Sequence, residues 1–248
     1  MVLEVEKKSI EILGVPVSQL TKSELIEISR CALKGGRPSG YIVTLNPEIA
    51  TLALKDRELL SAIRNALFVI PDGIGITWAV QRLHALRLQR IPGIELAEAL
   101  IKICAEEGLP VYFLGSRPGI SEKAAQNFRT LFPNINIAGF HHGFFKEEES
   151  TEIKEGIQQA GTALLIVGMG AGKQEKFLLS LPQSAYRLGI AVGGALEIWA
   201  GARSRAPLWM RKIGLEWLYR ILVEPRRLIR LAKTGPFFLR IWCLRKRN

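Results

Sequence analysis

The sequence has few cysteines and no long apolar run, and both shortages exclude classes of protein. Its three cysteines, Cys31, Cys104 and Cys243, lie far apart and form no CxxC pair. This argues against a disulfide framework or a structural zinc site and fits a reducing compartment. No stretch reaches the roughly 18 consecutive apolar residues of a membrane-spanning helix. The N-terminal residues also lack the apolar run of a signal peptide.

Histidine is equally scarce. His84, His141 and His142 do not have the spacing typical of metal ligands, and the His141-His142-Gly143 stretch is more typical of a turn after a strand. We therefore expect no bound metal and no other cofactor.

Basic charge is in excess, and the excess is confined to one end of the chain. The 248 residues include 34 lysines and arginines against 23 acidic residues. Residues 203–248 hold 13 of the basic side chains and two acidic ones, Glu216 and Glu224, whereas residues 1–202 hold 21 of each sign. A neutral body with a basic tail indicates a polyanionic partner, which is either nucleic acid or an anionic membrane surface.

Short apolar runs alternate with segments of helical periodicity along most of the chain. The capping-box sequence from Thr21 to Glu24 predicts the start of the first helix, and residues 9–17 predict a short β-hairpin or edge element. The runs that predict strands are 41–45, 66–70, 111–114, 135–140, 163–167 and 189–192. This alternation predicts an α/β fold with a Rossmann-like, mostly parallel sheet and helices on both faces.

The alternation stops near Ala202, where the composition changes. Residues 208–223 and 225–242 look helical, and Trp209, Ile213 and Trp217 are spaced as an apolar stripe among basic residues. We therefore predict an α/β catalytic domain at 1–202 and a basic amphipathic helical appendage at 203–248. Helices rich in Arg and Trp suit a membrane interface, so the appendage is expected to dock on a membrane.

Glycine-rich and polar residues follow the predicted strands at their carboxyl ends, where ligands bind in open α/β sheets. The stretch from Gly168 to Glu175 has the glycines and helix start of a phosphate-binding loop, but Gln174 after the lysine departs from the Walker A pattern. Asp72 follows another strand, and its carboxylate suits a general base. An alternative role for Asp72 is to cap a helix that begins at Gly73.

An ordered set of motifs lies along residues 9–230. Its stretches are Thr44-Leu-Asn46, Pro71-Asp72-Gly73-Ile-Gly75, Arg90-Ile-Pro-Gly93, Phe113-Leu-Gly115 with Pro118-Gly119, Gly168-Met-Gly170, Lys173-Gln174-Glu175, Val192-Gly193-Gly194, Gly201 with Arg205-Ala-Pro207, Gly214-Leu-Glu216-Trp217-Leu-Tyr219-Arg220 and Glu224-Pro225-Arg226-Arg227. Together they resemble the WecG/TagA/CpsF family, glycosyltransferase family 26. Two positions depart from the family pattern: Gly172 stands where proline is usual, and Ala191 where glycine is frequent.

The resemblance implies an inverting, metal-independent glycosyltransferase. Such an enzyme transfers N-acetylmannosamine, or a related hexosamine or uronic acid, from a UDP-sugar to N-acetylglucosamine on undecaprenyl diphosphate. The product serves the synthesis of wall teichoic acid or a surface polysaccharide. The enzyme would be cytoplasmic and peripheral on the inner face of the cell membrane.

The same resemblance assigns roles to individual residues. Asp72 would be the general base, with Thr44, Gln174 and Arg90 as further catalytic residues. In the family, arginines of the C-terminal helices close over the active site. The substrate-binding residues would be Asn46, Gly73, Gly115, Gly168, Gly170, Lys173, Glu175, Gly193, Gly194, Arg220, Arg227 and Arg230.

Two other functions compete with this one. A nucleotide-binding α/β module with a nucleic-acid-binding tail would explain the basic charge, but the apolar spacing of the tail favours helix burial and no recognised nucleic-acid motif is present, so no nucleic acid is expected as a partner. A Rossmann-type oxidoreductase needs an acidic residue about 20 positions beyond a GxGxxG turn, which the sequence lacks. A homo-oligomer is compatible with the sequence.

Overall fold

The computed structural model describes residues 8–36, 39–225 and 227–244. Its centre is a six-stranded parallel sheet with the strand order β4-β3-β8-β7-β5-β6. A separate antiparallel hairpin forms near the N-terminus. The strands are β1 (Ser9–Ile12), β2 (Val15–Ser18), β3 (Gly40–Leu45), β4 (Phe68–Pro71), β5 (Val111–Gly115), β6 (Ile137–His141), β7 (Leu164–Gly168) and β8 (Leu188–Ala191). The predicted fold class is confirmed.

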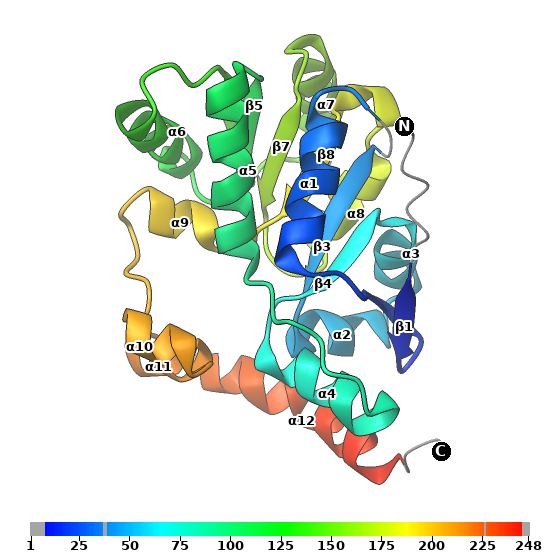
Figure 1. Cartoon of the computed structure of the whole chain (residues 1–248). Helices are drawn as coiled ribbons and strands as arrows, with labels where there is room; N and C mark the ends of the chain where they lie inside the picture. Colours follow the sequence, from blue (N-terminus) through cyan, green and yellow to red (C-terminus); the bar gives the residue numbers. More distant parts are fainter. Residues whose placement is uncertain (1–7, 37–38, 226, 245–248) are drawn as a thin grey trace.

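Helices cover both faces of the sheet (Figure 1). One face packs against α1 (Lys22–Leu33), α5 (Gly93–Glu107), α6 (Ile120–Leu131) and α9 (Ala195–Trp199). The other packs against α2 (Pro47–Ala53), α3 (Arg57–Asn65), α7 (Glu147–Gln159) and α8 (Lys173–Ser180), with a 3-10 turn at Gln183–Ala185. The remaining helices are α4 (Ile74–His84), α10 (Leu208–Lys212), α11 (Glu216–Val223) and α12 (Arg227–Cys243), and Figure 1 shows them together at the end of the sheet where β3 and β4 finish.

The apolar strands form two cores because successive side chains of a strand point to opposite faces. In β3, Ile42 joins the core under α1 and α5, whereas Val43 and Leu45 join the core under α2 and α3. All three are fully buried. Strands buried on both faces read as continuous apolar runs, which is why the sequence predicts them well.

Local signals explain several helix boundaries. The capping box of α1 is present: the Thr21 hydroxyl accepts from the Glu24 backbone N–H at 3.3 Å, and the Glu24 carboxylate accepts from the Thr21 backbone N–H at 2.8 Å. The short α9 and the 3-10 turn were not predicted, because five residues or fewer carry no periodic pattern.

The segment 208–223 is divided into two helices. Gly214 stands between α10 and α11 with φ +78°, and a Cβ there would approach Cγ2 of Ile74 on α4 to 2.7 Å. The prediction of one stripe through Trp209, Ile213 and Trp217 was therefore wrong, since the three residues do not share a single helix. All three side chains are nevertheless exposed.

Helix α12 packs against α2 and α4. Its Phe237 and Ile241 are fully buried and belong to the same core cluster as Ile49 of α2 and Ile76 of α4. The neighbouring Phe238 ring lies 5.6 Å from the Trp78 ring of α4. Part of the segment 203–248 is thus joined to the body by a hydrophobic core.

This packing predicts that the loss of stability caused by an alanine substitution depends strongly on its position along α12. Phe237→Ala should destabilise the protein by about 3–5 kcal/mol, because it removes a fully buried ring. Leu239→Ala, two residues away on the exposed side, should change the free energy of unfolding by less than about 0.5 kcal/mol. Denaturant unfolding measures both, and equal effects would contradict the packing of α12 on the body.

Candidate active site

Asp72 lies directly after β4, at the carboxyl end of the parallel sheet. Its Oδ1 accepts a hydrogen bond of 2.8 Å from the backbone N–H of Gly93, the first residue of α5. The alternative in which Asp72 caps the helix after Gly73 was wrong, because α4 begins at Ile74 with Gly73 itself as its N-cap. The carboxylate instead ties β4 to the start of α5 and leaves Oδ2 for other chemistry.

Charged side chains from two parts of the chain, the segment before α5 and helix α11, act on Asp72. Burial raises the pKa of its carboxyl above the ordinary aspartate value, and Glu216 acts in the same direction. The Gly93 N–H, Arg220 and Arg90 oppose this rise in pKa by stabilising the charged form. A carboxylate with a raised pKa that is flanked by arginines is suited to proton transfer beside an anionic leaving group.

Thr44 and Asn46 occupy the end of β3, the strand next to β4, but the fold itself uses one polar atom of each. The buried Thr44 hydroxyl donates to the Ala191 carbonyl at 2.9 Å. Oδ1 of Asn46 accepts from the Ile49 N–H at 3.0 Å and caps α2. The amide nitrogen of Asn46 is the group that this residue has left for a ligand.

Glycines bring the turns after β5, β7 and β8 into direct contact. A Cβ on Gly115 would collide with the Gly168 carbonyl, and a Cβ on Gly168 would come within 2.6 Å of the Gly193 carbonyl. Ser116 continues this contact, since its N–H donates to the Gly168 carbonyl at 2.8 Å. Gly170 has φ +90°, a conformation that favours glycine. These three strand ends therefore form a close-packed backbone surface.

Gln174 and Glu175 connect two of these turns by hydrogen bonds. Both side chains are buried. Glu175 accepts from the Gly172 N–H and from Nε2 of Gln174, each at 2.8 Å, while Oε1 of Gln174 accepts from the Gly193 N–H at 3.0 Å. Burial raises the pKa of the Glu175 carboxyl. The two side chains hold the turns after β7 and β8 together, whereas the neighbouring Lys173 is exposed.

Arg203 and Glu197, which the sequence interpretation did not single out, join the body to the C-terminal helices. Arg203 forms ion pairs of 2.7 Å with Glu197 of α9 and with Glu224 at the end of α11. A Cβ on Gly194 would lie 2.8 Å from Nη1 of Arg203, so this guanidinium covers the turn after β8. The signal in the sequence was weak, because Arg203 was one basic residue among many.

The arginines predicted for the site have different positions. Arg90 and Arg220 both act on Asp72, and Arg220 is paired with Glu216 within α11. Arg90 also donates to the Arg211 carbonyl at 2.9 Å. The side chains of Arg227 and Arg230 lie outside what the structure describes, as do Arg226 and residues 245–248, which carry part of the predicted basic charge.

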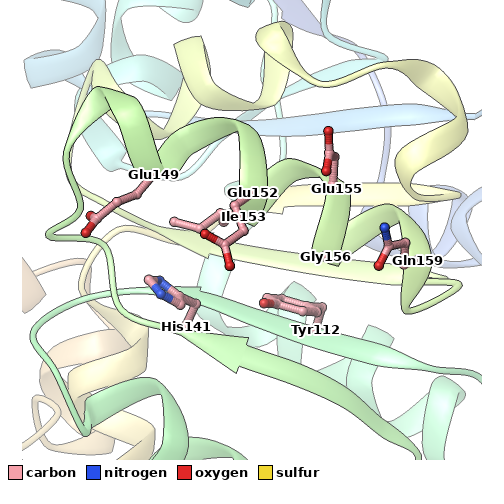
Figure 2. Close-up of a pocket in the computed structure, with 8 residues that line it drawn as sticks. All are labelled: Tyr112, His141, Glu149, Glu152, Ile153, Glu155, Gly156 and Gln159. Carbon is pink, nitrogen blue, oxygen red and sulfur yellow. The ribbon is translucent and has the colours of Figure 1, made fainter.

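A separate cavity of about 400 Å³ lies between α7 and the β5–β6 edge of the sheet. Figure 2 shows His141 and Tyr112 on the strands facing Glu152 on the helix. Its glutamates, which include Glu149 and Glu155, make it unsuited to a diphosphate. Across the described ranges, no three His, Cys, Asp or Glu side chains are grouped so as to hold a metal ion.

The chain is similar to known proteins over almost its whole length. Residues 10–248 match the family model described as "Glycosyl transferase WecG/TagA/CpsF family". The chain is 34% identical over 243 residues to the N-acetylglucosaminyldiphosphoundecaprenol N-acetyl-beta-D-mannosaminyltransferases of Staphylococcus aureus strains MRSA252 and NCTC 8325 / PS 47. Each alignment covers 96% of this chain and 94% of the relative. These matches do not favour the nucleic-acid-binding alternative.

Within the ranges that the structure describes, every helix is too short or too polar to cross a membrane.

Proposed function

Because the chain belongs to the WecG/TagA/CpsF family of glycosyltransferases, we propose that it transfers N-acetylmannosamine from a UDP-sugar to N-acetylglucosamine on undecaprenyl diphosphate. The names of the Staphylococcus aureus relatives support this acceptor and this sugar. The product would enter the synthesis of wall teichoic acid or another surface polysaccharide. The observation that carries the proposal is the Asp72 carboxylate at a strand end, flanked by Arg90 and Arg220.

In the proposed reaction Asp72 is the general base. It takes the proton from the attacking hydroxyl of the acceptor as that oxygen bonds to the anomeric carbon of the donor. The bond from this carbon to the diphosphate breaks, and UDP leaves with the bonding electrons. Arg90 and Arg220 supply positive charge near the developing anion, which stabilises the transition state.

The donor nucleotide would occupy the close-packed turns after β5, β7 and β8. Glycines there allow close approach of a ligand to the backbone, and α8, which begins directly after the turn that follows β7, places the positive end of its dipole beside them. Gln174 and Glu175 would act by holding these turns, since both side chains are buried in that network. Thr44 and Asn46 would border the sugar from β3.

Residues 203–248 would form an appendage that both completes the site and docks on the inner face of the membrane, while residues 1–202 form the catalytic domain. Support for docking comes from exposed apolar side chains among the basic residues: Leu208, Trp209, Ile213, Trp217, Leu222, Val223, Leu228, Ile229, Leu239 and Trp242. Each basic group near an anionic leaflet adds about 1 kcal/mol of binding. The sequence-based expectation of a homo-oligomer stays a prediction, which light scattering on the full chain tests.

Asp72 and Arg220 give a prediction for the pH profile. Arg220 lowers the pKa of Asp72, so Arg220→Gln should raise that pKa further. Asp72 would then become protonated at a higher pH as the solution is acidified, so the acid limb of the kcat/KM profile should shift to higher pH. Arg240→Gln on the exposed side of α12 is the control and should leave the limb in place. An acid limb that is unchanged or moves downward in Arg220→Gln would contradict Asp72 as the titrating base.

A donor panel tests the proposed sugar. UDP-N-acetylmannosamine, its uronic acid and UDP-N-acetylglucosamine would be offered with a short-chain lipid-diphosphate N-acetylglucosamine. Fastest turnover with the first supports the proposal. Preference for UDP-N-acetylglucosamine would overturn the sugar but keep the reaction class.

A further inference from the structure

A group of basic side chains gathers around Glu95, in the first turn of α5. Nη2 of Arg205 lies 2.8 Å from Oε1 of Glu95, Nη1 of Arg211 lies 3.8 Å from the same oxygen, and Nζ of Lys22 lies 3.5 Å from Oε2. Among the described residues, Glu95 is the sole carboxylate with which these three cations form ion pairs. The group therefore has an excess of positive charge.

This cluster, defined as Lys22, Arg205 and Arg211 with Glu95, adjoins the candidate active site through Arg90. Arg90 donates to the Arg211 carbonyl, and its charge also acts on Asp72. Asp72 in turn accepts from Gly93, two residues before Glu95. Arg90 and the start of α5 therefore link the cluster to the proposed base, Asp72.

The guanidinium groups of Arg205 and Arg211 are largely buried but have unsatisfied hydrogen-bond donors. The side chains of Arg205 and Arg211 are only 14% and 19% exposed. Nε of each is buried and has no hydrogen-bond partner within the described part of the chain. Like charges gathered away from water repel each other, and unpaired guanidinium N–H groups are costly, unless an anion joins them.

We propose that Arg205 and Arg211 bind the diphosphate of the lipid-linked acceptor. Arginine forks match phosphate oxygens by paired hydrogen bonds. This assignment rests on the proposed function.

The position of the cluster selects the acceptor over the donor. In the sheet order β4-β3-β8-β7-β5-β6, the glycine turns proposed for the nucleotide follow β8, β7 and β5. The cluster instead surrounds the start of α5, which Asp72 ties to the end of β4. Arg211 belongs to α10, whose Leu208 and Trp209 are exposed apolar residues. The acceptor diphosphate must bridge a reacting sugar and a lipid chain, so a site between Asp72 and an apolar surface fits it.

Arg211→Gln tests the assignment, because Arg211 has the longest contact to Glu95 and contributes least to the ion pairs that hold α10. Two readouts apply to the full chain: titration calorimetry with inorganic pyrophosphate and with UDP, and the KM values for the donor and for a short-chain lipid-diphosphate acceptor. We expect pyrophosphate binding to weaken and the acceptor KM to rise by about tenfold or more, with UDP affinity and donor KM unchanged. Arg211→Lys should recover part of the loss, and Arg129→Gln, an exposed arginine of α6, should change none of these values.

Glu95→Gln should change the affinity for pyrophosphate in the direction opposite to Arg211→Gln. Removing the competing carboxylate should tighten pyrophosphate binding, whereas a cluster that is only structural would show no gain. A rise in donor KM without a rise in acceptor KM would overturn the assignment to the acceptor, and unchanged pyrophosphate binding in Arg211→Gln would overturn the anion site itself. Failure of the proposed function is separate, since it appears as an inactive wild type while the calorimetry with pyrophosphate still reports on the cluster.

Discussion

Asp72→Asn is expected to lower kcat by about 10²- to 10⁴-fold, the contribution typical of a general base. The substitution removes the negative charge and the basicity of the side chain but keeps its structural hydrogen bond, because the asparagine carbonyl can still accept the Gly93 N–H that ties β4 to α5. Folding and UDP affinity should therefore be retained. Stopped assays of sugar transfer, combined with titration calorimetry with UDP, measure both quantities on the same protein.

Asp56→Asn is a matched control for this variant. Asp56 also accepts a backbone N–H, that of Leu59, at the start of a helix, and it pairs with Lys176 of α8. The same chemical change there should leave kcat within about twofold of the wild type. Near-wild-type turnover in Asp72→Asn would remove Asp72 as the base, whatever the control shows.

The second large effect concerns the membrane. Replacing Trp209, Ile213 and Trp217 by serine should weaken binding to anionic vesicles by about tenfold or more, because each side chain would lose apolar area that a bilayer interface buries. The net charge of the chain does not change, so the variant separates apolar insertion from electrostatic attraction. Vesicle co-sedimentation at two salt concentrations measures the loss.

Equally exposed apolar side chains on the body provide the comparison. Leu131 and Phe144 lie outside the C-terminal segment and are as exposed as Trp209. Serine at these two positions should leave vesicle binding unchanged, and turnover with a soluble short-chain acceptor should survive in both variants. If both sets of substitutions weakened vesicle binding equally, docking through the C-terminal helices would be wrong.

The elements that the sequence predicts best are those with a strong local signal. Buried strands such as β7 appear as apolar runs, and the capping box at Thr21 marks the start of α1 in the sequence. The break at Gly214 was missed because its cause is a contact with Ile74, which is 140 positions earlier in the chain. A pattern within a short window carries no information about such a contact.

The candidate site shows the same division between local and distant information. The strand-end position of Asp72 follows from the apolar run before it, and its motif suggested a base. That its partners are Gly93, Arg220 and Glu216 follows only from the fold, which brings α5 and α11 to the end of β4. Gln174 and Glu175 likewise read as ligand-binding residues in the sequence, but in the structure they form a buried network that joins two turns.

We propose that the Asp72 carboxylate at the end of β4 acts as the base in a single displacement onto a lipid-linked sugar. The anomeric configuration of the product, determined by NMR after transfer from α-linked UDP-N-acetylmannosamine to a short-chain acceptor, tests this most directly. We expect a β-linked disaccharide on the diphosphate lipid, with one UDP released for each sugar transferred. An α-linked product, or release of UDP without transfer, would contradict it.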